Sequence, residues 1–249
     1  MSWRIVRWWL AGLTAYLIFL LATFPAAYPL AWWQKGIPDV QLSKISGSVW
    51  SGAAQEFILN GQSWGVLQWH VDWRALVTGH MGYRLRLLAS DMDLQGRVAG
   101  SRDNLLLQGV HGHLPIGRLE GLLPLPASSV SGNLDVDLNR VLLVKMRPAQ
   151  ADGIVTFTDA VLSWPQSVIL GSYQLKVSDL DKTGIRGIFI DTGGPLIVQG
   201  TLNLTPSGRY QVNGTLMSRD PDNATLANLL GYLPADNTGH HAFNLHGQW

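Results

Sequence analysis

The motif with the clearest chemical meaning is Gly61-Gln-Ser63-Trp-Gly65, which matches the G-x-S-x-G pattern of α/β-hydrolases. In those enzymes a sharp strand-to-helix turn exposes the serine hydroxyl to a histidine base. Here the next residues, VLQWHVDW, alternate as a strand does, and no β-α-β pattern surrounds them. We therefore interpret the motif as a hairpin turn and not as a nucleophile.

The stretch SGSVWSG, residues 46–52, has the glycine spacing of a phosphate-binding loop at Gly47 and Gly52. Such a loop needs a lysine and a Ser or Thr after the second glycine, and two alanines stand there instead. We predict that the stretch is a strand that enters a sheet, with Val49 and Trp50 as its packing residues.

Two pairs of histidines have metal-ligand chemistry. A strand would place His111 and His113 on one face, and His240 and His241 are adjacent. A zinc site needs roughly three or four converging ligands, and no Cys, Asp or Glu cluster accompanies either pair. We expect no metal and no cofactor, and we assign these histidines to solvated strand faces.

Two pairs of carboxylates, Asp91 with Asp93 and Asp179 with Asp181, have the residue type needed for acid–base catalysis. Nothing in their surroundings indicates a shared proton, so we assign them to solvated charge. With no catalytic constellation in the sequence, we predict a protein that is not an enzyme.

Several tryptophans could serve as binding residues. Four of them lie close together in sequence and one lies in the second half of the chain: Trp50, Trp64, Trp69, Trp73 and Trp164. They could line an apolar groove for a lipid or peptide, or they could form core and cross-strand pairs, the commoner role of aromatics in sheets.

The first element that the sequence predicts is an N-terminal membrane anchor. Residues 8–34 contain no Asp, Glu, Lys, Arg or His, and a transmembrane helix needs about 20 apolar residues. Arg4 and Arg7 precede the span, so the positive-inside rule predicts a cytoplasmic tail at 1–7, a transmembrane helix at 8–28 and an exported remainder. A cleaved signal peptide is the alternative, but the apolar run exceeds its usual length of roughly 7–15 residues. The anchor residues are Trp8, Trp9, Leu10, Leu17, Phe19 and Phe24.

After the anchor, the sequence is dominated by alternation with a period of two. In NLDVDL, Leu134, Val136 and Leu138 share one face and polar residues occupy the other, as in a half-buried strand. Runs at 92–98 and 242–249 alternate in the same way. TPSG at residues 205–208 predicts a hairpin turn, and further short alternating runs separated by turn residues predict a mainly β fold.

Helical periodicity is scarce. Asn223 could cap ATLANLLGYL, in which Leu226, Leu229, Leu230 and Leu233 follow helical spacing up to a proline. A shorter helix is predicted in IGRLEGLLPLP, residues 116–126.

These helices suggest an internal duplication. GRLEGLLPLPASSVSGNLDVDL and ATLANLLGYLPADNTGHHAFNL both read as a short helix, Leu-Pro-Ala, a polar turn and an alternating strand. We predict two tandem β-rich repeats at 40–140 and 141–249, forming one continuous, curved antiparallel sheet because no linker divides them.

Composition excludes some classes of protein. The net charge is +1, so no basic footprint for nucleic acid is present. The chain contains no cysteine, which excludes disulfides and thiolate chemistry.

The order and spacing of these features resemble the type II (general) secretion pathway protein N family. The shared features are a basic tail, an anchor that ends near YPLAWW, the SGSVWSG stretch, GVLQWHVDWRALVTGHMGYRL, and GIVTFTDAVLSW in the second half. The resemblance implies a single-pass inner-membrane protein of Gram-negative bacteria with its C-terminal domain in the periplasm. Its implied role is to assist export of folded proteins, with other inner-membrane components or the secretin as partners.

Two binding mechanisms follow. Exposed strand edges could pair with another secretion component by strand addition. A more remote similarity to AsmA-like proteins implies instead a sheet whose apolar inner face holds a lipid acyl chain.

Overall fold

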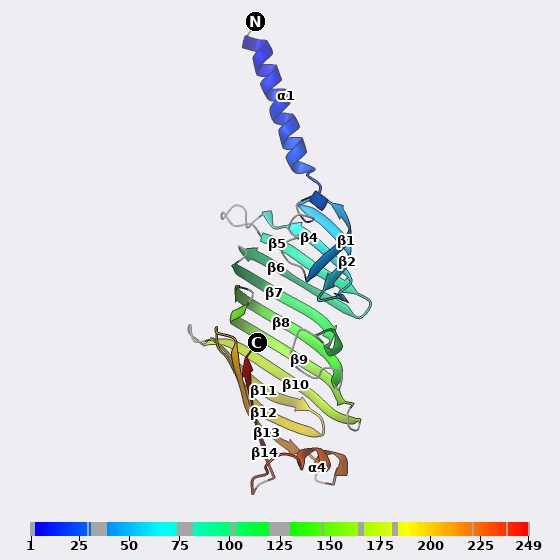
Figure 1. Cartoon of the computed structure of the whole chain (residues 1–249), viewed down its shortest axis with the longest axis vertical. Coiled ribbons are helices and arrows are strands. Elements are labelled where there is room, and N and C mark those ends of the chain that lie inside the picture. The colour runs from blue at the N-terminus through cyan, green and yellow to red at the C-terminus, as the bar shows by residue number, and fades with distance from the viewer. Residues whose placement is uncertain are drawn as a thin grey trace. The chain divides into compact units, whose positions relative to one another are not determined.

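The structure is a computed structural model, shown in Figure 1. It describes residues 3–28, 30, 39–73, 82–100, 103–119, 130–145, 147–163, 167–180, 184–220, 222–237 and 239–248. The chain divides into two compact units, Met1–Ala89 and Ser90–Trp249, and each is described by itself.

The first unit contains one long helix and a small antiparallel sheet. Helix α1 spans Trp3–Ala22. The strands are β1 (Val40–Gly47), β2 (Ser51–Leu59), β3 (Gln62–Ser63), β4 (Val66–Val71) and β5 (Gly82–Ala89). They pair in the order β1-β2-β4-β5, and β3 pairs with β2. The core of this sheet is formed by Ala54 and Trp69, which pack with Ala26.

Residues 46–52 form a hairpin and not a single strand, so that prediction is wrong. Gly47 ends β1 and pairs with Gly52 in β2. The hydroxyl of Ser48 accepts hydrogen bonds from the backbone N–H groups of Trp50 and Ser51, each at 3.3 Å. A serine that bonds to the backbone two residues later stabilises a turn, and this local bond interrupts the strand.

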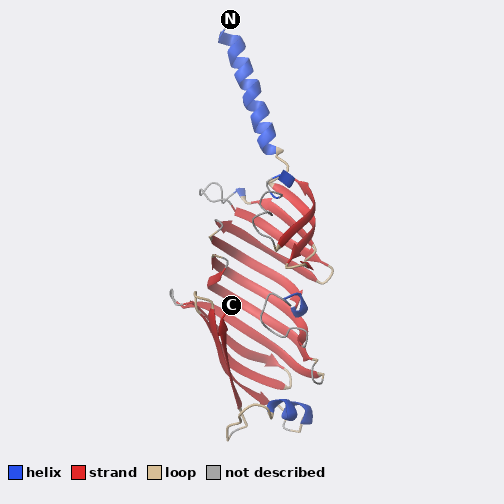
Figure 2. Ribbon diagram, viewed as in Figure 1, coloured by secondary structure: helices blue, strands red, loops and turns tan. Residues whose placement is uncertain are grey.

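The second unit contains the longer sheet. Its strands are β6 (Met92–Gly100), β7 (Asn104–Pro115), β8 (Val130–Val144), β9 (Arg147–Leu162), β10 (Val168–Leu180), β11 (Gly184–Gly193), β12 (Leu196–Leu204), β13 (Arg209–Ser218) and β14 (His241–Gln248). Each strand from β6 to β13 pairs antiparallel with the next one in sequence. Figure 2 shows the strands of this unit as a single layer. The prediction of a mainly β, antiparallel fold is confirmed.

The alternation in the sequence correctly identifies the strand faces. In β8, Leu134 is buried and Val136 and Leu138 are half-buried, whereas Asp135 and Asp137 are exposed. The predicted turn at Thr205–Gly208 also forms, with the Gly208 N–H donating to the Thr205 carbonyl at 2.9 Å.

Helix α4 (Ala224–Leu230) forms where a capped helix is predicted. The Asn223 side chain accepts a hydrogen bond from the Leu226 N–H at 3.1 Å, the usual N-cap geometry. Of the shorter predicted helix, the structure shows a 3-10 turn, η1, at Ile116–Leu119, and residues 120–126 lie outside the described residues. The two-repeat division stays a prediction.

Among the described residues, no helix meets the combined length and hydropathy required of a membrane span.

Candidate binding surface: the apolar face of the second sheet

The strand register of the second unit aligns apolar residues on one face. Residues that oppose each other in antiparallel strands point to the same side of a sheet. One such row crosses the unit from β8 to β14: Val136, Val155, Leu175, Phe189, Gly200, Gly214 and Phe243. We call the side of the sheet that carries this row the apolar face.

Glycines on this face leave room for large side chains of neighbouring strands to pack flat against the sheet. A Cβ atom at Gly214 would stand 2.7 Å from the Phe243 ring, and one at Gly187 would stand 2.7 Å from Leu175. One at Gly247 would stand 2.5 Å from the Tyr210 hydroxyl. Neighbouring strands therefore cover each other's side chains, and part of the apolar burial takes place within one layer.

The apolar face stays partly open. Val155, Leu175 and Phe189 are half-buried, and Leu245 is 57% exposed. At one end of the face, α4 buries Leu226 and Leu230 against strand residues that include Leu196. Partly exposed apolar side chains of this kind are compatible with a surface that another molecule covers.

Three polar side chains on the apolar face have partners. Asp191 forms an ion pair with Arg219, and Asp179 forms one with Arg140 at 2.6 Å. The Tyr173 hydroxyl donates to the Leu170 carbonyl at 2.7 Å. Burial, and secondly the Asp191 carboxylate, raise the pKa of this tyrosine, so it stays neutral. The face therefore presents neutralised charges beside its apolar side chains.

The opposite face of the same sheet, which we call the polar face, is richer in polar residues, although it also carries the exposed Ile188 and Ile190. His111 opposes Asp137, and His113 lies between Asp93 and Asp135 in the register. His111 bonds through Nδ1 to the Gly109 carbonyl oxygen at 2.7 Å. In the part of the chain that the structure describes, no three His, Cys, Asp or Glu side chains are grouped to hold a metal ion.

The other histidine pair, His240 and His241, forms hydrogen bonds within the turn that precedes β14. The backbone N–H of His240 donates to the Asp236 carboxylate at 2.9 Å, and His241 bonds through Nδ1 to the Leu233 carbonyl oxygen at 3.1 Å. These bonds fix the segment between α4 and β14.

The tryptophans beside and within the strands of the first unit differ in how far they are buried. Trp64 and Trp69 are buried, at 5% and 6% exposure. Trp50 stacks on Trp73 with ring centroids 5.3 Å apart, and Trp73 is 60% exposed. Trp164 lies outside the described residues. The structure thus places Trp64 and Trp69 in core positions and leaves one face of the Trp50–Trp73 pair accessible.

Trp64 and Trp69 are predicted to respond differently to replacement by phenylalanine. The Trp69 indole N–H donates to the Ser48 carbonyl at 3.1 Å, whereas the buried Trp64 N–H has no partner among the described residues. Because only Trp69→Phe breaks a hydrogen bond, it should cost about 1–2 kcal/mol more than Trp64→Phe, measured by urea unfolding. An equal cost would show that the Trp64 N–H is bonded.

Ser63 lies in β3, which pairs with β2 across the turn at Asn60 and Gly61. Positive φ angles of 52° and 77° at these two residues are typical of a two-residue hairpin turn. The interpretation of Gly61–Gly65 as part of a hairpin is confirmed. The Asn60-Gly61 dipeptide is the sequence signal for this turn.

The carboxylates assigned to solvated charge are partly engaged. Asp91 pairs with Arg118 at 2.5 Å, and this hydrogen bond holds the pKa of Asp91 below its ordinary value. Asp179 accepts a hydrogen bond from the Ala151 N–H at 2.7 Å besides its ion pair. Both carboxylates still reach solvent, with side-chain exposures of 43% and 23%, so the ion pairs add partners to the assignment of solvated charge. Asp181 lies outside the described residues.

The Asp91–Arg118 pair predicts a pH dependence of stability. Because the folded-state pKa of Asp91 is lowered, the pair stabilises the fold at neutral pH, and this contribution disappears as the pH falls through that pKa. Arg118→Gln should lower the urea midpoint at pH 7 slightly and leave it unchanged near pH 2. Lys176→Gln, a charge change on the polar face, is the control. A difference that persists at pH 2 would contradict the pairing.

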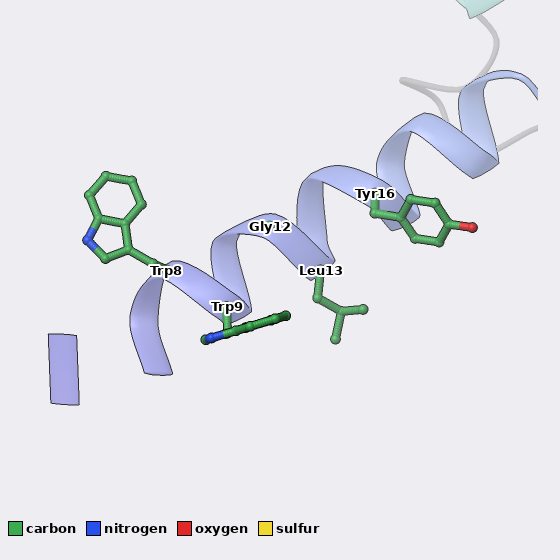
Figure 3. A pocket seen from close by; sticks show the side chains of 5 residues that line it. All are labelled: Trp8, Trp9, Gly12, Leu13 and Tyr16. Atoms are coloured by element: carbon green, nitrogen blue, oxygen red, sulfur yellow. The ribbon is translucent and has the colours of Figure 1, made fainter. Parts of the chain in front are cut away.

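The residues chosen as membrane anchor lie on or just after α1. Trp8 and Trp9 are 78% and 77% exposed, and Leu10, Leu17, Phe19 and Phe24 are also exposed. Figure 3 shows Trp8, Trp9, Leu13 and Tyr16 around Gly12, where they line an open hollow of about 400 Å³ on the helix surface. This helix presents large apolar side chains outward.

Fold and surface define a class: a predominantly antiparallel β-protein whose longer sheet has one face richer in apolar side chains and one richer in polar side chains. The model of the family described as "Type II secretion system (T2SS), protein N" matches residues 38–244. The chain belongs to this family, as its sequence features indicated.

Two relatives extend this finding. The chain is 27% identical over 223 residues to the type II secretion system protein N of Vibrio cholerae serotype O1, covering 84% of this chain and 85% of that protein. It is 25% identical over 252 residues to the protein of the same name from Klebsiella pneumoniae, covering 94% and 92%. No solved structure matches the chain significantly.

Proposed function

We propose that the chain is a non-enzymatic component of the type II secretion system that assists export of folded proteins across the outer membrane. It acts by binding other inner-membrane components or the secretin. The observation that carries this proposal is the family match over residues 38–244, which includes the described strands of both units up to the first half of β14.

We further propose that residues 8–28 anchor the chain in the inner membrane, with 1–7 in the cytoplasm and the repeats 40–140 and 141–249 in the periplasm. The support comes from a helix of 20 residues and from the lack of Asp, Glu, Lys, Arg and His between Trp8 and Gln34. Large apolar side chains point outward along it, as the hydrocarbon of a bilayer requires.

The secretion role is tested by deleting the gene in its own host and measuring release of a folded exoprotein. We expect the exoprotein to accumulate in the periplasm and release to recover when the chain is supplied again. Photo-crosslinking residues at the exposed Ile188 and Tyr232 should capture another subunit of the machine. Unchanged release together with no crosslink to a machine subunit would refute the proposal.

The topology is tested with a reporter that is active only in the periplasm. Fused after Trp249 it should be active, and fused after Arg7 it should be inactive. The reverse pattern, or activity at both positions, would overturn the proposed orientation. A cleaved signal peptide would instead reveal itself as a shorter N-terminus in the mature chain.

A second candidate function is supported by the half-open apolar face: it holds an acyl chain, as in AsmA-like proteins. Detergent-purified chain should then carry lipid that mass spectrometry detects. Val155→Arg places a cation on the apolar face and should remove the lipid. Its neighbour Thr156 points to the polar face, so Thr156→Arg should leave the lipid bound. A wild-type chain free of lipid that still restores secretion would exclude this function.

A further inference from the structure

The last strand of the second unit has an open edge. β14 pairs with β13 along one side, in a register without shifts from Arg209–Gln248 to Leu216–His241. Its sequence, HAFNLHGQ, contains no Lys, Arg, Asp, Glu or Pro. Charges, prolines and bulges are the devices by which edge strands avoid pairing with other chains, and β14 has none of them.

The start of β14 is covered and its remainder is not. The Ala242 N–H donates to the Pro234 carbonyl at 3.2 Å, and the His240 carbonyl accepts from the Asp236 N–H at 2.8 Å. Ala235 also bridges to His241. For residues 243–248, the described part of the chain supplies no further backbone partner beyond the β13 ladder.

The edge strand of the first unit differs from β14. β1 carries Lys44 at its centre, with a left-handed φ of 52°. At the end of β1, the carbonyl of Gly47 accepts a hydrogen bond from the Ala26 N–H, and just beyond it the Val49 N–H donates to the Phe24 carbonyl. β1 therefore has both a charge and an irregular backbone against strand addition, whereas the open part of β14 has neither.

The chemistry of an open strand edge fits one kind of partner. Its outward N–H and C=O groups are matched by another extended polypeptide. The side chains of β14 are compatible with a second β14. A two-fold axis at Leu245 opposes Leu245 to itself, Phe243 to Gly247 and Asn244 to His246, with apolar residues on one side and polar residues on the other.

Charge and burial also favour self-pairing. In a two-fold symmetric interface the same surface patch of both copies is in contact. A charged residue near the axis would therefore lie beside the same charge in the other copy. β14 has no such charge, and Leu245, which is 57% exposed, would be covered by its counterpart. The apolar faces of the two sheets would continue into each other.

We propose that two copies of this chain associate by antiparallel pairing of β14 with β14 around Leu245. This inference goes beyond the proposed function and does not rest on it.

The absence of cysteine from the chain allows a clean crosslinking test. Directly opposed residues in an antiparallel pair lie about 4.5–5.5 Å apart between Cα atoms, which is within the range of about 4.4–6.8 Å for a disulfide. The full-length Leu245→Cys chain, oxidised in detergent, should therefore give a covalent species of twice the monomer mass. Val212 opposes Leu245 one strand inward, so two copies of residue 212 would be separated by roughly three strand spacings, about 14 Å. Val212→Cys should not crosslink.

A second measurement uses no disulfide. Light scattering of the full chain in detergent should give a protein mass of two copies. Leu245→Lys places two lysines at the axis and should halve that mass, while Asn213→Lys on the polar face of β13 should not change it. A monomeric wild-type chain, crosslinking at Val212 equal to that at Leu245, or a Leu245 crosslink only to a protein of different mass would each overturn the proposal.

Discussion

Gly112→Ala is expected to unfold or severely destabilise the second unit. Gly112 lies in β7 opposite Leu94 of β6 and Val136 of β8. Its φ is +146°, and a Cβ atom there would stand only 1.9 Å from the Asp93 carbonyl oxygen. That atom belongs to the backbone of the neighbouring strand, so it cannot move without disturbing the β6–β7 ladder. The loss should be about 3 kcal/mol or more.

The measurement is pulse proteolysis of the full chain in increasing urea, which reports the fraction still folded. Gly117→Ala is the matched control, because Gly117 lies just beyond the same strand and a Cβ atom there meets nothing within 4 Å. Its effect should stay within about 0.5 kcal/mol. Similar midpoints for the two variants would show that β6 and β7 do not approach each other as closely as the structure has them.

Gly109→Ala separates strain from contact. Gly109 has a φ of +56° but open space around its Cβ position, so only the left-handed backbone conformation penalises alanine there. We expect an intermediate loss of about 1 kcal/mol. The order Gly112, Gly109, Gly117 would therefore follow from geometry, although the three positions carry the same substitution.

Alternation in the sequence was sufficient to predict the faces of the strands. Leu134, Val136 and Leu138 alternate with carboxylates, and a period of two allows only one assignment of faces. The same holds for α4, because Asn223 caps a run with helical leucine spacing and its side chain has a backbone N–H within reach. Local rules decide these elements, so a single sequence contains the necessary information.

Long-range geometry was not predictable in the same way. The ring of Phe243 lies over Gly214, and Trp69 lies over Gly52, but these residues are far apart in sequence and nothing local links them. The pairing of Asp91 with Arg118 likewise depends on how β6 and η1 approach each other. Alternation identifies the residues that share a face, and it does not identify what covers that face.

The apolar face illustrates this distinction. A sequence of alternating leucines and valines is usually taken to indicate a core between two layers. In the second unit the strands form one layer, and side chains such as Leu175 and Phe189 stay half-buried. Glycines on the neighbouring strands permit lateral packing instead, so stability and a partly open binding surface are compatible in the same sheet.

Leu226→Ala should have the second large effect, because α4 is held to the sheet by few residues. Leu226 is fully buried, at 0% exposure, and it packs in one cluster with Val168, Leu196 and Leu230. Removing a buried leucine side chain costs about 2–5 kcal/mol, depending on how well the site collapses. A seven-residue helix is too short to form alone, so most of this cost should appear as release of α4.

Pulse proteolysis of the full chain again measures the loss. Asn228→Ala is the control, because residue 228 is exposed on the same helix. Alanine is more favourable than asparagine in a helix by roughly a few tenths of a kcal/mol. It should leave the midpoint unchanged or slightly raised.

Since α4 and the 234–236 segment connect β13 to β14, release of α4 should also loosen β14, so Leu226→Ala is expected to weaken the β14-mediated dimer. A destabilised chain that keeps its full dimer mass would show that β14 is held by β13 alone, independently of the helix beside it.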